Sequence, residues 1–249
     1  MNSLVLRILT VFVFFAVLPA SALAQSCFLG NCAEPVGQGV WEVQFGLQYD
    51  DYKDARFLQA PRIEVNYGLT PDFQLHVMAP FQYADVRGVD SRYGFGDMEF
   101  GAVYRFIQEN AWLPQFSVYP LVVTPTGDEK KGLGTGEVEV FVPIWFKKGL
   151  GAWELFGGGG FWINSGAGNE NFWETRVGLE HAFSDRWKLG FELYHYTPER
   201  DDWESRTGFN VGAALHLDRM NHLLFTVGRD FDDVKRASVN ASYVLTFGR

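Results

Sequence analysis

Residues 41–49 read WEVQFGLQY, the clearest example of a pattern that recurs along most of the chain. Its odd-numbered positions are large and apolar, and its even-numbered positions are an acid, an amide or glycine. Side chains on a β-strand point alternately to its two faces, so this segment has one apolar face and one polar face. The alternation predicts a strand that lies between an apolar and an aqueous environment.

Twelve segments with this period can be identified after residue 38. They comprise residues 40–49, 62–68, 73–83, 97–107, 115–124, 137–147, 152–163, 172–183, 187–196, 207–217, 222–229 and 238–247. Most of them are close to the ~9–11 residues that a tilted strand needs to cross a bilayer. No stretch after residue 24 is long and apolar enough to predict a membrane-spanning helix.

The connections between these segments alternate in length. Every second connection is short, as at residues 69–72 and 184–186, and the others are much longer. Short turns on the periplasmic side and long loops outside are typical of outer-membrane β-barrels. We therefore predict an all-β fold, a transmembrane antiparallel β-barrel of about 12 strands in a Gram-negative outer membrane. A secreted soluble β-sandwich is the alternative that this length allows.

The N-terminus has the pattern of a secretion signal. Arg7 is the only charged side chain in residues 1–24, residues 8–18 are almost purely apolar, and Ala22 and Ala24 occupy the positions that a signal peptidase reads. We expect residues 1–24 to be a cleaved signal peptide, residues 25–38 a periplasmic segment and residues 39–249 the barrel. Lipid modification of Cys27 is the alternative.

Charge and cysteine content exclude several classes of protein. The net charge is −9 and no basic stripe is present, which argues against a nucleic-acid partner. Cys27 and Cys32 are candidates for a local disulfide, and two thiols are too few for a structural zinc site. The five histidines are scattered, with none at metal-ligand spacing from another. We expect no metal and no cofactor.

Enzymatic motifs are also missing. The spacing from Gly127 to Gly132 resembles a phosphate loop, but Leu133 follows where that motif needs Lys and Ser or Thr. No serine stands near a histidine by any visible rule, so we predict that the chain is not an enzyme. A membrane hydrolase with a spatially assembled site is the alternative.

Charged residues lie on the polar face of the predicted strands, which places them in the lumen, because an Arg or Lys facing lipid costs ~2–4 kcal/mol near the midplane. These are Glu42, Glu64, Asp97, Glu99, Glu137, Glu139, Glu154, Glu174, Glu180 and Glu192, with Arg62, Arg105, Lys147, Arg176 and Lys188. The best candidates for lining a water-filled path are Glu99, Arg105, Glu139, Glu174, Arg176 and Glu192. Alternatively, these charges pair across strands and fill the lumen.

Two glycine-rich segments have open interpretations. The connection at residues 125–136 contains four glycines and the charged run Asp128, Glu129, Lys130 and Lys131. It is a candidate constriction loop at the barrel mouth, or else an ordinary surface loop. The four glycines at 157–160 indicate a bend in the wall or, alternatively, the close approach of a neighbouring group.

Four short motifs resemble a known family. They are GLTPDFQL at 68–75, GDMEFG at 96–101 followed by YRF at 104–106, PTGD at 125–128 and GLGTG at 132–136. In this order they resemble the MetA-pathway of phenol degradation family of outer-membrane transporters. The resemblance implies a barrel and the passage of small hydrophobic or aromatic compounds. Because the motifs are mainly glycine and turn positions, they indicate the fold better than the chemistry.

The sequence thus predicts a monomeric outer-membrane channel for passive passage of small molecules, including hydrophobic or aromatic ones. Its partners would be outer-membrane lipid, the solute and the barrel assembly machinery, which reads a C-terminal aromatic residue such as Phe247. The alternative is a structural or surface-interaction barrel with a filled lumen and no transport. In that case the acidic loops Asp50–Arg56 and Glu199–Arg206 would bind divalent ions or partners.

Overall fold

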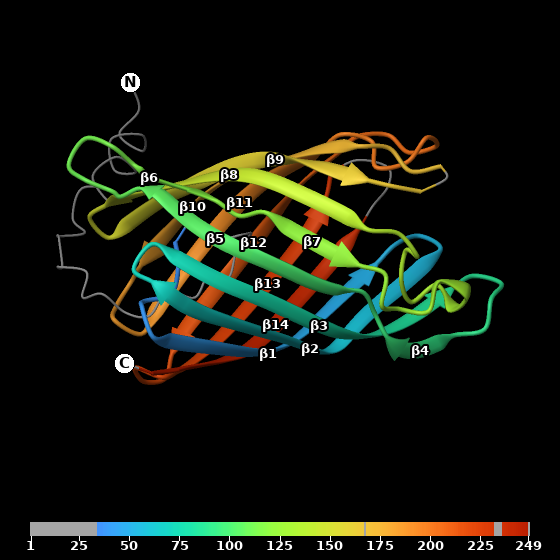
Figure 1. Cartoon of the computed structure of the whole chain (residues 1–249), viewed down its shortest axis with the longest axis horizontal. Helices are drawn as coiled ribbons and strands as arrows, with labels where there is room; N and C mark the ends of the chain where they lie inside the picture. The colour runs from blue at the N-terminus through green and yellow to red at the C-terminus, as the bar shows by residue number, and fades with distance from the viewer. Residues whose placement is uncertain (1–33, 167, 232–235, 249) are drawn as a thin grey trace, which may run out of the picture.

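One antiparallel sheet closes on itself to form a barrel (Figure 1). The computed structural model describes residues 34–166, 168–231 and 236–248. Closure is made by β1 (Val40–Asp51) and β14 (Ala237–Gly248), which pair along their whole lengths. A closed sheet leaves no unpaired edge, and this is the condition for placing strands in lipid.

The remaining strands follow the chain around the barrel. They are β2 (Ala55–Thr70), β3 (Phe73–Val86), β4 (Arg92–Phe95), β5 (Met98–Ile107), β6 (Gln115–Val118), β7 (Leu121–Thr124), β8 (Glu139–Leu150), β9 (Trp153–Asn164), β10 (Phe172–Ala182), β11 (Trp187–Tyr196), β12 (Arg206–His216) and β13 (Asn221–Asp230).

Two barrel strands are interrupted, so these segments form a closed barrel of 12 strands. β3 pairs with both β4 and β5, and β8 pairs with both β6 and β7. The second interruption falls at Pro120, whose nitrogen has no hydrogen to donate to the ladder. The predicted fold is confirmed.

The connections at one end of the barrel are short, and β1 begins and β14 ends there (Figure 1). This is the periplasmic end in barrels of this type. The prediction of a long connection at residues 50–61 is wrong, because β1 and β2 extend toward each other and leave only residues 52–54 between them. Pro61 is accommodated in β2 by a register shift between Gln59 and Arg62, which is how a strand tolerates proline. The predicted acidic loop Asp50–Arg56 is therefore the tip of a hairpin.

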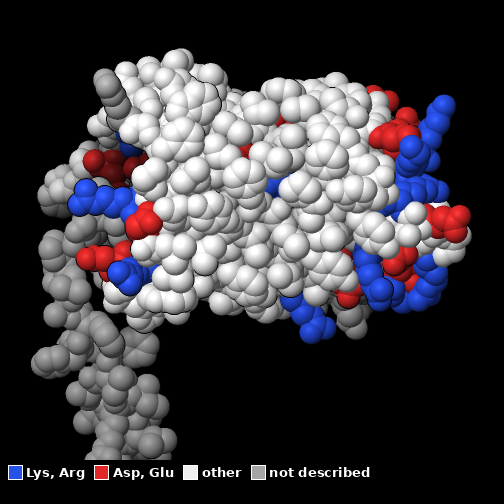
Figure 2. All heavy atoms as spheres, turned by 90° about the horizontal axis from the view of Figure 1, so that it is seen from below, with Lys and Arg blue, Asp and Glu red and all other residues white. Residues whose placement is uncertain are grey.

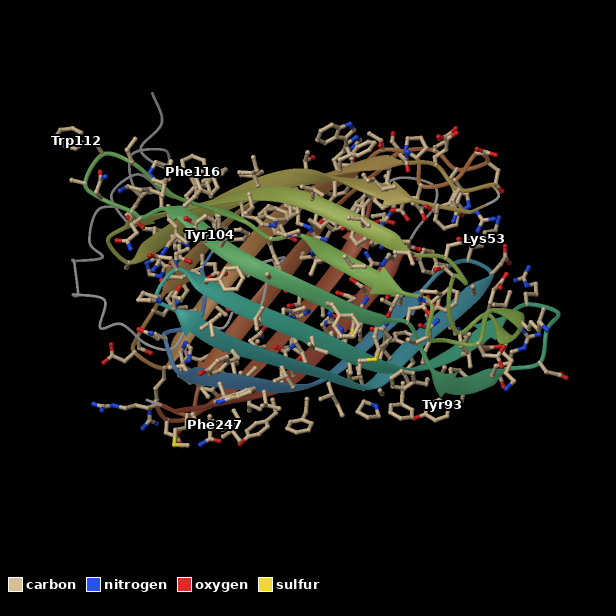
Figure 3. All side chains as sticks on the ribbon, in the orientation of Figure 1. Lys53, Tyr93, Tyr104, Trp112, Phe116 and Phe247 are labelled. Atoms are coloured by element: carbon tan, nitrogen blue, oxygen red, sulfur yellow. The ribbon has the colours of Figure 1, made fainter. Side chains whose placement is uncertain are left out.

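The outer face is an apolar band. Figure 2 shows a nearly uncharged middle region with charged side chains gathered at the two ends. Val142 and Ile144 on β8 are each 53% exposed on this face. In Figure 3 the labelled rings of Tyr93 and Phe247 project away from the wall. Exposed apolar surface of this extent is explained by contact with lipid hydrocarbon.

Helical structure is almost absent. The described part of the chain contains one 3₁₀ turn, η1 (Glu129–Lys131), and no helix there has the length and apolar character needed to cross a membrane. The candidate disulfide residues Cys27 and Cys32 and the predicted signal peptide lie outside the described residues.

Candidate functional site in the barrel lumen

A cavity of about 540 Å³ runs inside the barrel. It reaches from Glu34 and Val36 at the periplasmic end to Tyr52 and Arg236 at the opposite end. Its wall carries twice as many carboxylates as guanidinium groups. The carboxylates are Glu34, Glu42, Asp50, Glu64, Glu99, Glu139, Glu174 and Glu199, and the guanidiniums are Arg62, Arg176, Arg206 and Arg236.

Arg176 is the centre of a buried ion-pair network. Its Nε donates to Glu174 at 2.6 Å and its Nη1 to Glu192 at 2.9 Å, and Nη2 contacts the Tyr196 hydroxyl. Asn210 donates a second hydrogen bond of 2.7 Å to Glu192, which is 0% exposed. Register explains the assembly, because Glu192 on β11 pairs with Gly178 on β10, which makes it the diagonal neighbour of Arg176 on the same face.

The Arg176→Met variant will be less stable by about 3–5 kcal/mol, because Glu174 and Glu192 would remain buried without their cation. Urea unfolding in detergent, followed by heat-modifiable gel migration, measures this change. The Asn210→Ala variant is the matched control and removes only one neutral partner of Glu192. Equal small effects from both variants would contradict the central role of Arg176.

The acidic side chains lie mainly on the opposite half of the barrel. Glu64 on β2 is six barrel strands away from Arg176 on β10, which places them across the lumen from each other. Among the described residues, no Lys or Arg lies within 4.0 Å of Glu99 or Glu139. The lumen therefore has an arginine-bearing wall around Arg176 and an acidic wall with Glu42, Glu64 and Glu99, where the guanidinium in the main cavity is that of Arg62, 4.0 Å from Glu64.

Amide side chains organise the acidic wall. Asn66 Nδ2 donates to Glu42 at 3.3 Å and to Glu64 at 3.0 Å. Asn66 Oδ1 accepts from Gln74 Nε2 at 2.8 Å and lies 2.9 Å from His76 Nδ1. Since Oδ1 can only accept, this contact assigns the proton of His76 to Nδ1. The network fixes both carboxylates against the wall.

A second group of ion pairs lies at the extracellular mouth. Arg236 Nη2 is 2.7 Å from Asp50, and Arg206 contacts Glu199 at 2.5 Å. The Arg206 guanidinium also lies 4.0 Å from the centre of the Tyr196 ring, a cation–π arrangement. These pairs join the β1 end, the β11–β12 connection and the start of β14. The predicted acidic loop Glu199–Arg206 is thus held in part by the ion pair between its first and last residues.

Aromatic rings occupy one side of the lumen. Phe141 stacks on Trp162 with ring centres 4.5 Å apart, and Trp162 stacks on Phe172 at 5.7 Å. Phe141 and Trp145 lie against Gly160 and Gly158, where a Cβ would collide with β8. The ladder stays continuous through the glycine tract. The structure therefore supports the second interpretation of residues 157–160, the close approach of a neighbouring group, here the side chains of Phe141 and Trp145.

The loop between β7 and β8 bends over the lumen side of β4. Asp97 accepts hydrogen bonds from the backbone N–H groups of Gly127 at 2.8 Å and Thr135 at 2.7 Å. Leu133 is 2% exposed and packs where a Cβ of Gly94 would lie. Gly94 pairs with Gln82 on β3, while its neighbours Tyr93 and Phe95 face outward. Leu133 is therefore the loop residue that is buried against the inner face of β4, and it does not line the main cavity.

The charged run in this loop stays on the surface. Asp128, Glu129, Lys130 and Lys131 are exposed, and Lys131 Nζ is 2.9 Å from Asp128. The hydrogen bond from Lys131 lowers the pKa of the Asp128 carboxyl. These four side chains do not line the cavity.

The predicted lumen residues fall into three groups. Glu99, Glu139, Glu174 and Arg176 line the main cavity, and Arg105 lines a second cavity of about 330 Å³ at the periplasmic end. Glu192 is buried behind Arg176 and lines neither cavity. The expectation that Glu137 points inward is wrong, because this exposed residue precedes the first residue of β8.

Several lumen groups were not predicted from the sequence. They include Glu34, the Arg206 and Arg236 pairs, and the histidine pair of β12 and β13. The Nδ1 atoms of His216 and His222 are 2.8 Å apart, a contact that the scattered positions of the histidines in the sequence did not indicate. Among the described residues, no three His, Cys, Asp or Glu side chains could hold a metal ion together.

A closed barrel of 12 strands with an apolar outer band and a polar lumen cavity is an outer-membrane β-barrel of the porin-like class. Residues 36–246 match the family described as the MetA-pathway of phenol degradation, and the chain belongs to this family. No curated protein matches it.

Three solved structures illustrate the likeness in fold. An outer membrane channel from Pseudomonas putida F1 is 17% identical, with a TM-score of 0.72, over 88% of this chain and 99% of that chain. The KdgM porin is 10% identical, with a TM-score of 0.58, over 82% and 99%. The CymD monoaromatic hydrocarbon channel is 7% identical, with a TM-score of 0.50, over 86% and 89%. At such identities the comparison supports the architecture, and the function rests on the lumen.

Proposed function

We propose that this protein is a passive outer-membrane channel for small molecules that favours cations over anions. The observation that carries the proposal is the lumen cavity with its eight carboxylates and four guanidiniums. Charges of one sign in a cleft with low-dielectric walls raise the local concentration of the opposite ion. The proposal assigns the lumen a transport role and requires no catalytic residue, no cofactor and no energy source.

The arrangement of the charges supports this preference. The guanidiniums of Arg176, Arg206 and Arg236 each contact a carboxylate at 2.9 Å or less. Glu99 and Glu139 have no such partner among the described residues, so their charge acts on a passing solute. A cation would be drawn along the acidic wall, and an anion would meet three arginines with close carboxylate partners and Arg62, which lies 4.0 Å from Glu64.

Reversal potentials in planar bilayers under a KCl gradient test the preference. We expect discrete current steps and a reversal potential whose sign shows that potassium is more permeant than chloride. The double variant Glu64→Gln with Glu99→Gln should move that potential toward zero, because it removes two carboxylates from the wall. The control Glu204→Gln changes an exposed loop residue and should leave the potential unchanged.

Aromatic surface beside the carboxylates extends the proposal to solutes with an apolar part. Trp162 and Phe172 reach the cavity, and Trp162 Nε1 donates to Glu174 at 3.0 Å. This combination suits a small ring that bears a cationic group. Liposome swelling with benzylammonium and benzoate, which share one ring and differ in charge, compares the two classes directly. Faster entry of benzoate would contradict the proposal.

A structural barrel without transport is the second candidate, because Phe141, Trp145 and the Arg176 network fill part of the lumen. A folded protein that produces no current steps in the same bilayers would favour this second candidate over the channel. In either case we propose a monomer that is inserted by the barrel assembly machinery and surrounded by lipid.

A further inference from the structure

The chain segment before β1 crosses the periplasmic mouth of the barrel. Glu34 lines both the main cavity and the periplasmic cavity, so it stands at the boundary between them. Pro35 is buried, and the backbone N–H of Val36 donates to Gln74 Oε1 at 2.7 Å. The solute path therefore meets this segment before it reaches the periplasm.

Ion pairs hold the segment in place. Glu34 Oε1 is 3.5 Å from Arg105 Nη1, and Glu34 Oε2 contacts Lys147 Nζ. The side chains of Arg105 and Lys147 are only 15% and 11% exposed, so these contacts are screened less than surface pairs. Residues 34–36 belong to no strand, and the ladder begins at Val40.

Both cations keep a carboxylate partner on the barrel when Glu34 leaves. Arg105 Nε is 2.7 Å from Asp72, and Lys147 Nζ is 3.2 Å from Glu154. Hydrogen bonds from Arg105 and Gln108 lower the pKa of the Asp72 carboxyl, so it stays ionised. Release of the segment thus leaves no buried cation unpaired, which keeps the cost of opening small.

We infer that Glu34–Val36 is a periplasmic gate whose latch is the Glu34 carboxylate between Arg105 and Lys147. In the closed position it separates the two cavities, and its displacement joins them. The inference rests on the proposed channel function for its consequence, because a gate matters only where solutes pass. The displacement itself can be measured without transport.

Gly68 gives a second way to displace the segment. A Cβ at this position would collide with the carbonyl oxygens of Val36 and Gly37. The Gly68→Ala variant therefore pushes the segment from the wall and leaves the charges of Glu34, Arg105 and Lys147 intact. If Gly68→Ala and Glu34→Gln have the same effect, the effect comes from displacement of the segment and not from the change of charge at residue 34.

Thiol labelling measures the position of the segment. In the full chain with Cys27→Ser and Cys32→Ser, a Val36→Cys variant is treated with a membrane-impermeant maleimide, and heat-modifiable migration reports folding. Glu34→Gln and Gly68→Ala should each raise the labelling rate roughly tenfold, since the ionic latch or its seat is lost. The matched variant Glu154→Gln removes the other carboxylate of Lys147, so release of Glu34 would leave that cation unpaired and the labelling rate should fall below the wild-type value. Equal rates in all folded variants would overturn the gate.

Single-channel recording then tests the consequence. Conductance should rise about twofold in Glu34→Gln and Gly68→Ala and should not exceed the wild-type value in Glu154→Gln, because only the first two open the constriction. Raised labelling with unchanged conductance would overturn the gate. Raised labelling with no current in any variant, wild type included, would overturn the channel function and still establish a displaceable segment.

Discussion

The Ile144→Arg variant will assemble into a folded barrel less completely than the wild type. Ile144 lies at the middle of β8 and is 53% exposed on the lipid face, so the guanidinium would sit near the bilayer midplane. The cost there is ~2–4 kcal/mol, a large part of the stability of a typical protein domain. Heat-modifiable gel migration after refolding into lipid vesicles measures the folded fraction, which should fall clearly below that of the wild type.

Two controls test the assignment of faces and depth. Glu139→Gln lies on the lumen face of the same strand and should fold like the wild type. Val140→Arg lies on the lipid face near the end of the strand, where the penalty is smaller, so it should fold partly. If Ile144→Arg folded as well as Glu139→Gln, the register of β8 would have to shift by one residue.

The barrel could be predicted because lipid constrains one face of every strand. On β8, residues 140, 142, 144 and 146 are apolar and face outward as expected. The constraint acts only on the outside, and the lumen face accepts both charged and apolar groups. Phe141 and Trp145 therefore sit inside the barrel although alternation alone indicated a polar face there.

Strand ends were less predictable than strand centres. The alternation breaks at Pro61, where β2 continues through a register shift, and this led to a false loop at residues 50–61. The alternation also begins before the strand does: the predicted segment starts at Glu137, whereas β8 starts at Glu139. In both cases hydrogen bonding to a neighbouring strand determines the boundary, and a single segment does not reveal it.

Contacts between strands depend on register, which the sequence reveals only near short turns. His216 and His222 are equally distant from the centre of the β12–β13 turn, so their pairing could have been inferred from the hairpin. The pairing of Glu34 with Lys147 joins residues 113 positions apart and has no local pattern. Arg236 with Asp50 is a similar case, because barrel closure alone brings them together.

The second large effect concerns the loop between β7 and β8, which we propose narrows the extracellular mouth. Asp97 anchors it through Gly127 and Thr135, and Leu133 fills the space above Gly94. Asp97→Ala removes the charged acceptor that two backbone N–H groups of the loop share, so the loop should be held less firmly.

Deletion of residues 129–134 removes Leu133 together with the charged run and should raise single-channel conductance more than Asp97→Ala does, because no part of the loop can return. The double variant Asp128→Ala with Lys131→Ala separates the contribution of the charged run to the constriction from that of Leu133. It breaks an exposed, solvent-screened ion pair and leaves Leu133 in place, so its conductance should equal that of the wild type. If the double variant conducted as much as the deletion, the constriction would depend on charge, as the sequence suggested. If a folded deletion variant conducted no more than the wild type, the loop would be a surface feature, and the narrowest point of the path would lie elsewhere in the lumen.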